Sequence, residues 1–355
     1  MNLKKILTLT LACSIFTLSV QAEEIGGVNV TGEAAFDYNL VTLKNQSIPG
    51  GGGAKDNQYR FNYAQLILKK ETEKLNFFGR LFYLPTEYES NGKQSTSNLG
   101  VLNQLEIFYK VDSKLQVGFG RFLTSLGYES PFRTVNHTYN YTISRQTLYP
   151  GYAEGLRAKY HFTPEILAIV SSYNRFADST FGDDNSTSKA TEAAITGTSG
   201  KLRWYAGYIT SRDNNLTEKV DNKGASIWGA YKFSDPFSFI ATYENRSADT
   251  KASAMKYTQS FTGTLVYVLG INNLALRYEH VRGANDINAI NAAADFKTAD
   301  KVESITLTDK IAIHENLNLY VEYRTDKADE KAFVKGNGGI VRNASMLTLG
   351  AIAHF

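Results

Sequence analysis

The chain ends on Ala344-Ser-Met-Leu-Thr-Leu-Gly-Ala-Ile-Ala-His-Phe355, in which apolar and polar residues alternate loosely up to a terminal phenylalanine. Alternation with a period of two predicts a β-strand that has one apolar face. Bacterial outer-membrane barrels commonly finish on a strand with an aromatic residue at its end. The ending therefore favours a transmembrane β-barrel.

The beginning of the chain agrees with export from the cell. Residues 1–22 carry two lysines near the start, an apolar stretch at 6–20 and the small residue Ala22 at the position expected for cleavage. This pattern is typical of a secretory signal peptide and not of a spanning helix. We expect 1–22 to be removed and 23–355 to form one β-barrel in the outer membrane of a Gram-negative bacterium.

Composition limits the class of protein further. No later stretch contains the roughly 18 apolar residues that a membrane helix needs, so any crossing must use strands, and only a closed barrel satisfies their backbone groups in lipid. The 22 Tyr and 20 Phe against 6 Pro suit strands. The only cysteine, Cys13, lies in the signal, so the mature chain has no thiolate chemistry. Without the two signal lysines the 38 basic residues fall to 36, against 35 acidic ones, which argues against a nucleic-acid partner.

Sixteen segments carry strand patterns long enough for a tilted crossing, which takes about 9–11 residues. Fourteen or eighteen strands stay open, because the weaker segment at 189–198 could merge with its neighbours. The predicted strands are 26–40, 57–70, 73–84, 101–111, 114–122, 151–162, 165–176, 189–198, 201–211, 223–233, 236–247, 256–269, 272–282, 301–313, 316–325 and 344–355.

The connections between these segments alternate strictly between short and long. Short turns such as Phe233-Ser-Asp-Pro236 alternate with much longer stretches. Outer-membrane barrels have this asymmetry, with tight periplasmic turns and longer extracellular loops, whereas a soluble β-sandwich has no reason for it. The long connections are expected at 41–56, 85–100, 123–150, 177–188, 212–222, 248–255, 283–300 and 326–343.

The two-residue period assigns the two faces of each strand. In 316–325, Leu317 and Val321 share one side, and Asn318 and Glu322 share the other. The apolar side should contact outer-membrane lipid, and the polar side should surround water, because about sixteen strands leave an aqueous channel. We expect ten charged residues to line this pore, and their basic excess predicts a mild anion preference. They are Arg80, Glu106, Arg157, Lys159, Arg203, Lys232, Arg277, Glu279, Glu322 and Arg324.

One residue conflicts with this assignment. When Ile305 and Leu307 face lipid, Asp309 does too, and a carboxylate on that face is unfavourable by an amount that depends on depth. A bulge that shifts the register, a position near the membrane interface, or a covering second subunit would each resolve the conflict.

The segment 123–150 is the longest connection and is rich in aromatic residues. A loop of this length and composition is expected to pack on something. Gly118 and Gly120 precede it on the inward side, and positions without side chains let another backbone approach closely. We expect the loop to fold into the pore, although an outward loop that closes the barrel mouth is the alternative. The pore-constriction candidates are Arg121, Glu129, Arg133 and Arg145.

The same region carries a resemblance to a known family. The patterns Gly120-Arg-Phe-x-Thr124-x-x-Gly127-x-Glu129 and Asn140-x-x-x-Ser144-Arg145, with Gly155 in the following strand, resemble the OmpL-like putative β-barrel porin family. The match is best over about 120–160. The resemblance implies an outer-membrane, diffusion-type porin whose solute is generally unassigned. The signature positions it carries over are Gly120, Arg121, Phe122, Gly127, Glu129, Ser144 and Arg145.

The sequence therefore predicts an outer-membrane porin, not an enzyme, that lets small hydrophilic solutes and ions diffuse passively. No cofactor or metal is expected, since none of the five histidines forms a ligand pair at helical or strand spacing. A homotrimer is plausible for this size. Two alternatives stay open: a binding or adhesion barrel with a closed lumen, and a hydrolase at the rim that would use His137, Ser144 and Glu129.

Overall fold

The computed structural model describes residues 23–42, 57–83, 102–149, 151–174, 189–214, 219–250, 253–283, 299–334 and 339–355. The predicted signal at 1–22 and the larger part of several predicted long connections lie outside these ranges. Among the described residues no helix is long and apolar enough to cross a membrane.

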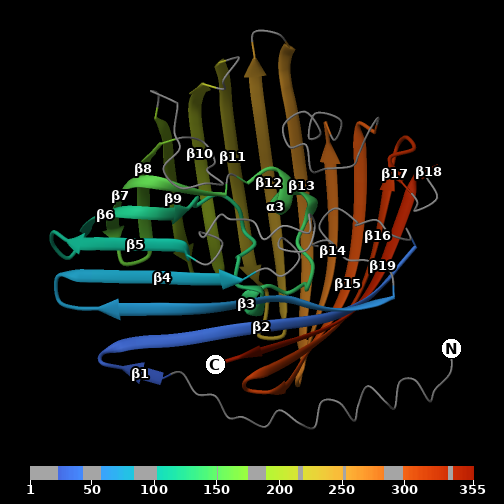
Figure 1. Cartoon of the computed structure of the whole chain (residues 1–355), viewed down its shortest axis with the longest axis horizontal. Helices are drawn as coiled ribbons and strands as arrows, with labels where there is room; N and C mark the ends of the chain where they lie inside the picture. The colour runs from blue at the N-terminus through green and yellow to red at the C-terminus, as the bar shows by residue number, and fades with distance from the viewer. Residues whose placement is uncertain are drawn as a thin grey trace, which may run out of the picture.

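Sixteen antiparallel strands form one closed ring, as predicted (Figure 1). Each strand pairs with the next along the chain, and the last, β19, pairs with the first long one, β2, through partners such as Ile352 and Ala35. A three-residue strand, β1 (Glu23–Ile25), adds to β2. The ring consists of β2 (Val28–Val41), β3 (Gln58–Glu71), β4 (Leu75–Tyr83), β5 (Leu102–Lys110), β6 (Leu115–Leu123), β7 (Tyr152–Thr163), β8 (Ile166–Tyr173), β9 (Ala190–Ser199), β10 (Leu202–Asn214), β11 (Lys219–Lys232), β12 (Phe237–Thr250), β13 (Ser253–Leu269), β14 (Asn272–Arg282), β15 (Lys301–His314), β16 (Leu317–Ala328) and β19 (Asn343–His354).

The C-terminal phenylalanine completes the ring at one edge. Phe355 and Gly32 each donate a backbone N–H to the carbonyl of the other, both at 3.0 Å. The aromatic ring lies where a side chain of residue 32 would be, because a Cβ there would come within 2.5 Å of it. Gly32 thus leaves room for the terminal aromatic residue against β2.

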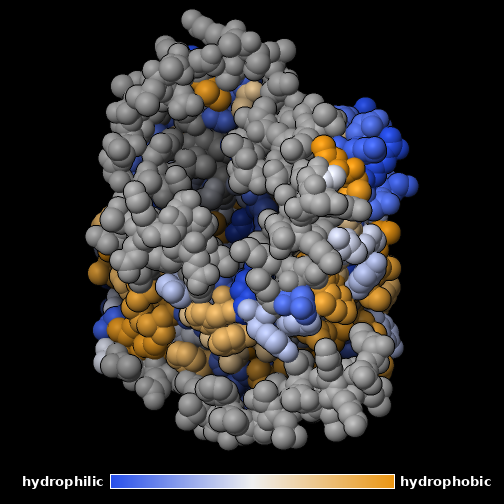
Figure 2. All heavy atoms as spheres, turned by 45° about the vertical axis from the view of Figure 1, so that its right-hand side comes forward, coloured by the Kyte–Doolittle hydropathy of each residue, from blue (hydrophilic) through white to orange (hydrophobic). Residues whose placement is uncertain are grey.

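The two faces of the strands have opposite chemistry. Large apolar side chains such as Leu156 and Leu307 are exposed. Figure 2 shows hydrophobic residues gathered over the lower part of the wall on the face in view. Inward-facing polar side chains, among them Arg324, Thr306 and Thr348, are fully buried. This arrangement is the reverse of a soluble protein and suits a wall that has hydrocarbon outside and polar groups inside.

The turns at one end of the barrel are tight, and their sequences explain why. In the connection from β5 to β6, the carboxylate of Asp112 accepts the amides of Lys114 and Leu115 at 2.7 and 2.8 Å. These two bonds hold the pKa of Asp112 below its usual range. Gly200 and Gly270, with φ near +60°, supply the left-handed residue in two further turns.

At the other end the structure differs from the sequence-based expectation in two connections. The stretches 212–222 and 248–255 were predicted as long loops, but most of each is strand, since β10 reaches Asn214 and β12 reaches Thr250. Opposite charges extend the ladder in the first case: Arg212 lies in register with Asp221 and pairs with it at 2.6 Å. The predicted connection at 326–343 also contains a small hairpin, β17 (Phe333–Val334) and β18 (Ile340–Val341).

Asp309 faces outward, and a bulge does not explain its position. It lies in register between Leu274 and Val321, both exposed on the apolar face. The only irregularity between β15 and β16 lies beyond it, between Ala312 and His314. A bulge therefore does not remove Asp309 from this face. Its Oδ1 atom is buried and has no hydrogen-bond partner among the described residues.

Gly120 holds a backbone conformation that only glycine tolerates. Its φ is +147°, and a Cβ at this position would lie 2.0 Å from the carbonyl oxygen of Leu105 on the neighbouring strand. Its register partner on β7 is Gly155. A Cβ at Gly155 would also lie 2.0 Å from a carbonyl oxygen, that of Ser172 on β8. The wall closes tightly at this point, just before the chain leaves it for segment 123–150.

We expect Gly120→Ala to lower the urea midpoint for unfolding of the barrel in lipid vesicles. Forcing a side chain into this conformation costs about 1–3 kcal/mol, before the contact with Leu105 is counted. Gly263→Ala is the matched control, because its new Cβ would meet Phe239 at an ordinary 3.5 Å. Equal midpoints for the two variants would show that the Gly120 geometry is not needed.

Candidate functional site

The segment between β6 and β7 lies inside the ring of strands and contains two short helical turns. They are η2 (Arg133–Val135) and α3 (Ile143–Thr147), the latter drawn in green within the barrel in Figure 1. Thr142 caps α3 by accepting the amide of Arg145 at 3.0 Å. The side chains around this segment belong to the inward faces of strands from several parts of the ring.

Two glutamates of the wall bind the backbone of the segment. Glu322 on β16 accepts the amides of Tyr139 and Asn140 at 2.7 and 3.1 Å. Glu279 on β14 accepts the amides of Ile143 and Ser144, the first residues of α3, at 2.8 and 2.9 Å. Hydrogen bonds from N–H groups to a carboxylate are about twice as strong as neutral ones. These carboxylates fix the path of the loop through its backbone.

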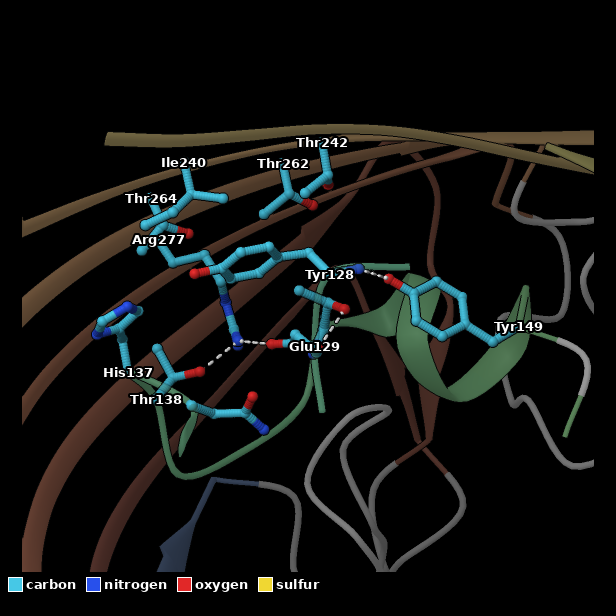
Figure 3. A pocket seen from close by; sticks show the side chains of 12 residues that line it. Tyr128, Glu129, His137, Thr138, Tyr149, Ile240, Thr242, Thr262, Thr264 and Arg277 are labelled. Carbon is cyan, nitrogen blue, oxygen red and sulfur yellow. Dashed lines mark hydrogen bonds and ion pairs between the residues drawn. The ribbon is translucent and has the colours of Figure 1, made fainter. Parts of the chain in front are cut away.

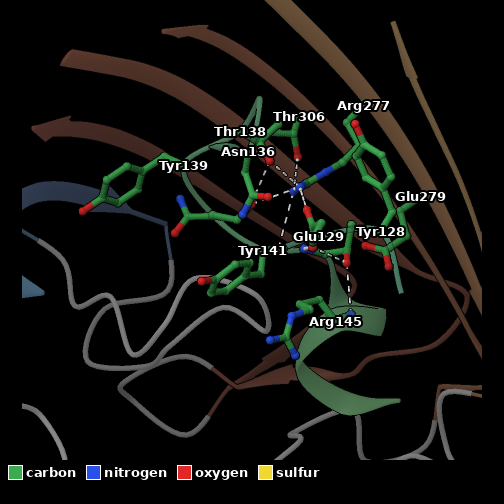
Figure 4. A network of polar contacts seen from close by, with 12 residues as sticks. Tyr128, Glu129, Asn136, Thr138, Tyr139, Tyr141, Arg145, Arg277, Glu279 and Thr306 are labelled. Carbon is green, nitrogen blue, oxygen red and sulfur yellow. Dashed lines mark hydrogen bonds and ion pairs between the residues drawn. The ribbon is translucent and has the colours of Figure 1, made fainter. Parts of the chain in front are cut away.

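Arg277, on β14 beside Glu279, is the centre of a second network (Figure 4). Its Nη1 donates to the Glu129 carboxylate at 2.8 Å, to Thr138 Oγ1 at 2.6 Å and to the carbonyl of Asn140 at 3.0 Å. Glu129 in turn accepts the amide and the hydroxyl of Thr142. One guanidinium therefore joins the wall to both arms of the segment, and both members of its ion pair are largely buried.

The beginning of the segment is fixed to a different part of the wall. Glu192 on β9 is fully buried and accepts the Ser125 amide at 2.7 Å, while Arg157 lies 3.4 Å from its other oxygen. Next to it, Phe122 packs into an apolar cluster with Phe108 and Tyr173. Since β9 lies across the sheet order from β14 and β16, the segment spans the interior between distant strands.

The wall leaves room for the segment by using small side chains. The inward positions of β13 and β15, which flank β14, carry only threonine and serine over the stretch that faces it. Short hydroxyl side chains keep the surface polar without filling the space that α3 occupies. These residues are Thr258, Ser260, Thr262 and Thr264 on β13, and Ser304, Thr306 and Thr308 on β15.

Apolar contacts cover the other side of α3. Ile143 and Leu148 are buried with Val302 and Met346 of the wall, and with Phe333 of the small β17–β18 hairpin. Burying such side chains contributes about 1.5–3 kcal/mol each. Helix α3 is thus held by carboxylates at its beginning and by a dry cluster along its flank.

A hollow remains between the segment and strands β12–β14 (Figure 3). Glu129 and Thr138 turn toward Arg277 on one side of it, and Thr242 lies on the wall. His137 also borders it, and burial together with the charge of Lys310 lowers the pKa of this histidine.

The family described as "Putative beta-barrel porin-2, OmpL-like" matches residues 27–355, almost the whole chain. The chain belongs to this family. No curated protein matches the sequence.

Solved porin structures share the fold. An anion-selective porin from Comamonas acidovorans is 14% identical with a TM-score of 0.61, over 92% of this chain and 99% of that one. The outer-membrane channel DcaP of Acinetobacter baumannii is 15% identical with a TM-score of 0.59, over 95% and 100%. OmpT of Vibrio cholerae in a trimer form is 15% identical with a TM-score of 0.60, over 92% and 99%. Likeness at these identities shows the fold, and the family shows that the protein is an outer-membrane porin.

The signature positions of the porin family have structural roles here. Gly127, with φ +96°, lies under the ring of Tyr149, which would overlap any side chain placed there. The Tyr149 hydroxyl accepts the amide of Tyr128 at 3.1 Å and donates to Glu244 on β12. Ser144 is buried, and its hydroxyl bonds to that of Thr142 at 3.1 Å. These residues fix the shape of the segment.

The four predicted constriction residues have different surroundings. Arg121 pairs with Glu154 on the adjacent strand at 3.0 Å, so its charge is matched within the wall. Glu129 pairs with Arg277, as described. Arg133 is buried against the rings of Tyr63, Tyr139 and Tyr141, and Arg145 lies against Tyr141 and Tyr149.

The predicted pore-lining residues also separate into groups. Four are described above: Arg157, Arg277, Glu279 and Glu322. Arg324 pairs with Asp326 at 2.9 Å and donates to the carbonyl of Tyr141, and Glu106 accepts Gln104 at 2.5 Å. Within the described part of the chain, Arg80 bonds to neutral groups only, among them Gln65. The Nζ atom of Lys159 lies 3.9 Å from the centre of the Phe108 ring. Arg203 is exposed and lies near the ring of Trp228. Lys232 pairs with Asp235 in a tight turn.

The arrangement offers little to a hydrolase. Ser144 and His137 share no hydrogen bond among the described contacts, and the Ser144 hydroxyl is already bonded to Thr142. Within the described residues no group of three side chains is placed to hold a metal ion. Family and fold point to a channel and not to an enzyme.

Some functional side chains were missed by the sequence reasoning. One of them is Glu192, which anchors the segment but did not appear among the candidates, although it occupies an inward position of a predicted strand. An acid in the middle of an inward face was the available signal. The pairing of a wall carboxylate with a backbone amide leaves no pattern in the sequence.

We expect Glu322→Gln to accelerate hydrogen exchange at the amides of Tyr139 and Asn140. A hydrogen bond to a charged group contributes about 1.5–3 kcal/mol, which corresponds to a rise of roughly tenfold to a hundredfold. Glu303→Gln on the outer face is the control, because it contacts only Tyr278 and His280 there. Unchanged exchange at both loop amides would mean that Glu322 does not hold the segment.

Proposed function

We propose that this porin lets small hydrophilic solutes and ions diffuse passively through its lumen, and that segment 123–150 sets the width of the passage. The observation that carries the proposal is the binding of four loop amides by Glu279 and Glu322. A loop that moves freely in water needs no buried carboxylates of the wall. A loop that sets a fixed pore width does need them.

A mild anion preference belongs to the same proposal, but fewer residues support it than a count of basic positions indicates. Arg121, Arg157, Arg277 and Arg324 each have a carboxylate partner, so their fields largely cancel at a distance. The preference would come from cations such as Arg145, Arg203 and Lys159, for which the described residues provide no ion pair.

A binding barrel with a closed lumen is the second candidate, and one observation favours it. The segment contacts strands as far apart as β9, β12 and β16, which brings protein across the lumen from several sides. Planar-bilayer recording separates the two candidates: discrete conductance steps support the porin, and silence supports the binding barrel.

We expect purified protein in planar bilayers to give discrete steps, and deletion of 130–145 to raise the single-channel conductance severalfold. The reason is that the deletion removes η2 and the first three residues of α3, with their wall contacts, from the lumen. The double variant Glu279→Gln, Glu322→Gln keeps the full chain and serves as a second route, with larger and noisier steps expected. Conductance unchanged in both variants, with the barrel folded, would refute a constricting role.

We also propose that the protein assembles as a homotrimer, as OmpT of Vibrio cholerae does in its trimer form. The expected result is a mass of three subunits by native mass spectrometry in mild detergent, with dissociation to single barrels in harsher detergent. A single-subunit mass under all mild conditions contradicts it.

A further inference from the structure

Three inward-facing cations lie against aromatic rings instead of acids. They come from β3, β7 and β10, and no ion pair of any of them occurs among the described residues. Lys69 and Arg203 are exposed, and Lys159 is half-buried, so all three side chains reach water. The distances from the charged group to the ring centre are 5.9 Å for Lys69 and Phe78, 3.9 Å for Lys159 and Phe108, and 6.0 Å for Arg203 and Trp228.

The three cations share one end of the barrel. Lys69 lies two residues before the end of β3 at Glu71, and Lys159 lies four residues before the end of β7 at Thr163. Arg203 is the second residue of β10. Each of these strand ends adjoins a tight turn, and in outer-membrane barrels the tight turns face the periplasm. We call Lys69, Lys159 and Arg203 the turn-end cations.

The rings beside these cations face the lumen, which fixes the direction of the cations too. Two of the rings contact a ring of the inserted segment, and the third packs in the buried cluster at the beginning of that segment. The distances between ring centres are 6.4 Å for Phe78 and Phe132, 5.3 Å for Trp228 and Tyr128, and 5.7 Å for Phe108 and Phe122. The turn-end cations therefore line the lumen near the tight turns.

An aromatic ring holds a cation in place without cancelling its charge. The negative face of the ring attracts the cation by about 0.5–1 kcal/mol at an exposed site, but the ring has no net charge. A carboxylate at ion-pair distance cancels most of the field, and several arginines nearer the long loops have one. These pairs are Arg60 with Asp37 at 2.7 Å, Arg121 with Glu154 at 3.0 Å, and Arg324 with Asp326 at 2.9 Å. The field of the turn-end cations instead extends into the water of the lumen.

The acids near this end do not neutralise the turn-end cations. By the register of their strands, Glu33 on β2 and Glu106 on β5 each lie four residues further from the turns than Lys69 and Lys159. Four residues of strand span roughly 13 Å. Glu71, at the end of β3, is paired with another lysine at 2.5 Å. Further acids of this end, such as Glu73 and Glu165, lie in the turns outside the strands.

Three other lumen cations without an acid have different surroundings. Arg80 is almost fully buried, and Arg145 is part of α3 and not of a strand end. Lys310 on β15 resembles the turn-end cations, but its ammonium donates to the carbonyl of Thr134, so the segment covers it. In the described part of the chain, the turn-end cations thus combine contact with water, a missing acid and a place at one mouth of the lumen.

We propose that Lys69, Lys159 and Arg203 form an anion-selecting mouth at the turn end of the channel. The inference rests on the proposed porin function and gives its charge preference a place. Fixed positive charges at one mouth concentrate anions there and exclude cations. Because arginines nearer the other mouth are paired with acids, the two directions of current are not equivalent. The current is larger when the voltage drives anions in through the turn end, since salt then accumulates in the lumen behind this mouth.

The first test is the current–voltage curve of single channels in potassium chloride. At about 0.1 M, where charges act over about 10 Å, we expect currents at equal and opposite voltages to differ by roughly 1.5-fold or more. At about 1 M this range falls to about 3 Å, and the two currents should become equal. The triple variant Lys69→Gln, Lys159→Gln, Arg203→Gln should conduct equally in both directions at the low salt too. The charge-conserving variant Lys69→Arg, Lys159→Arg, Arg203→Lys should keep the asymmetry.

The second test uses one cysteine to change the charge within a single channel. Cys13 lies in the predicted signal, so Arg203→Cys places a single thiol in the mature chain. A cationic methanethiosulfonate reagent should restore the asymmetry that this variant loses, and an anionic reagent should lower it further. The reaction should be faster from the side whose anions carry the larger current. Lys223→Cys, exposed on the outer face of β11, is the control, and neither reagent should change its currents.

The outcomes distinguish this mouth from the porin function. Clear channels with equal currents in both directions at low salt overturn the mouth and leave the porin standing. An asymmetry that persists in the triple glutamine variant, or that is lost in the charge-conserving variant, also overturns it, because the charges are then not the cause. Faster reaction from the opposite side places the selecting charges at the wrong end. Silent bilayers overturn the porin and the mouth together.

Discussion

Closure of the sheet is the constraint on which the rest of this structure depends. Backbone N–H and C=O groups that face hydrocarbon have no water to bind, so every strand must have two neighbours. The pairing of β19 with β2, finished by the mutual bonds of Gly32 and Phe355, removes the last free edge. A closed ring of sixteen strands is so wide that inward side chains on opposite sides of the barrel do not touch. Polar side chains, water and the inserted segment share the space between them.

The backbone amides of the inserted segment need hydrogen-bond acceptors, and carboxylates of the wall provide them. A loop inside a barrel exposes backbone amides in a place with little water, where an unpaired donor costs about 1–3 kcal/mol. Glu279, Glu322 and Glu192 supply acceptors from the wall, and each would itself be costly if left alone. Wall and segment therefore stabilise each other, and neither set of polar groups is well placed without the other. Gly127 and Gly350 also help to fix the segment, because they leave room for the rings of Tyr149 and Tyr139.

The sequence predicted the strands well because their pattern is local. The two-residue period of a strand and the turn that follows it can both be recognised within about a dozen residues. Because the apolar side must contact lipid, Leu317 and Glu322 were assigned to the correct faces. The lengths of β10 to β13 were underestimated, because strands that continue beyond the membrane lose the apolar signal and rely on pairs such as Arg212 and Asp221. The partners of the segment were not predictable. Glu322 and Tyr139 are 183 residues apart, and only the closed ring brings them together.

The lumen presents fewer free positive charges than its number of arginines and lysines indicates. Adding up inward arginines and lysines treats each as a free charge facing water, but Arg277 and Arg324 are tied to carboxylates and to loop carbonyls. Their role is to position the segment, and their fields are short-ranged because each has an opposite charge within 3 Å. The proposed anion preference then depends on the few cations left without an acid, which come both from the loop and from the wall. A porin of this family with the same composition but a different path for segment 123–150 would expose other charges and favour other solutes.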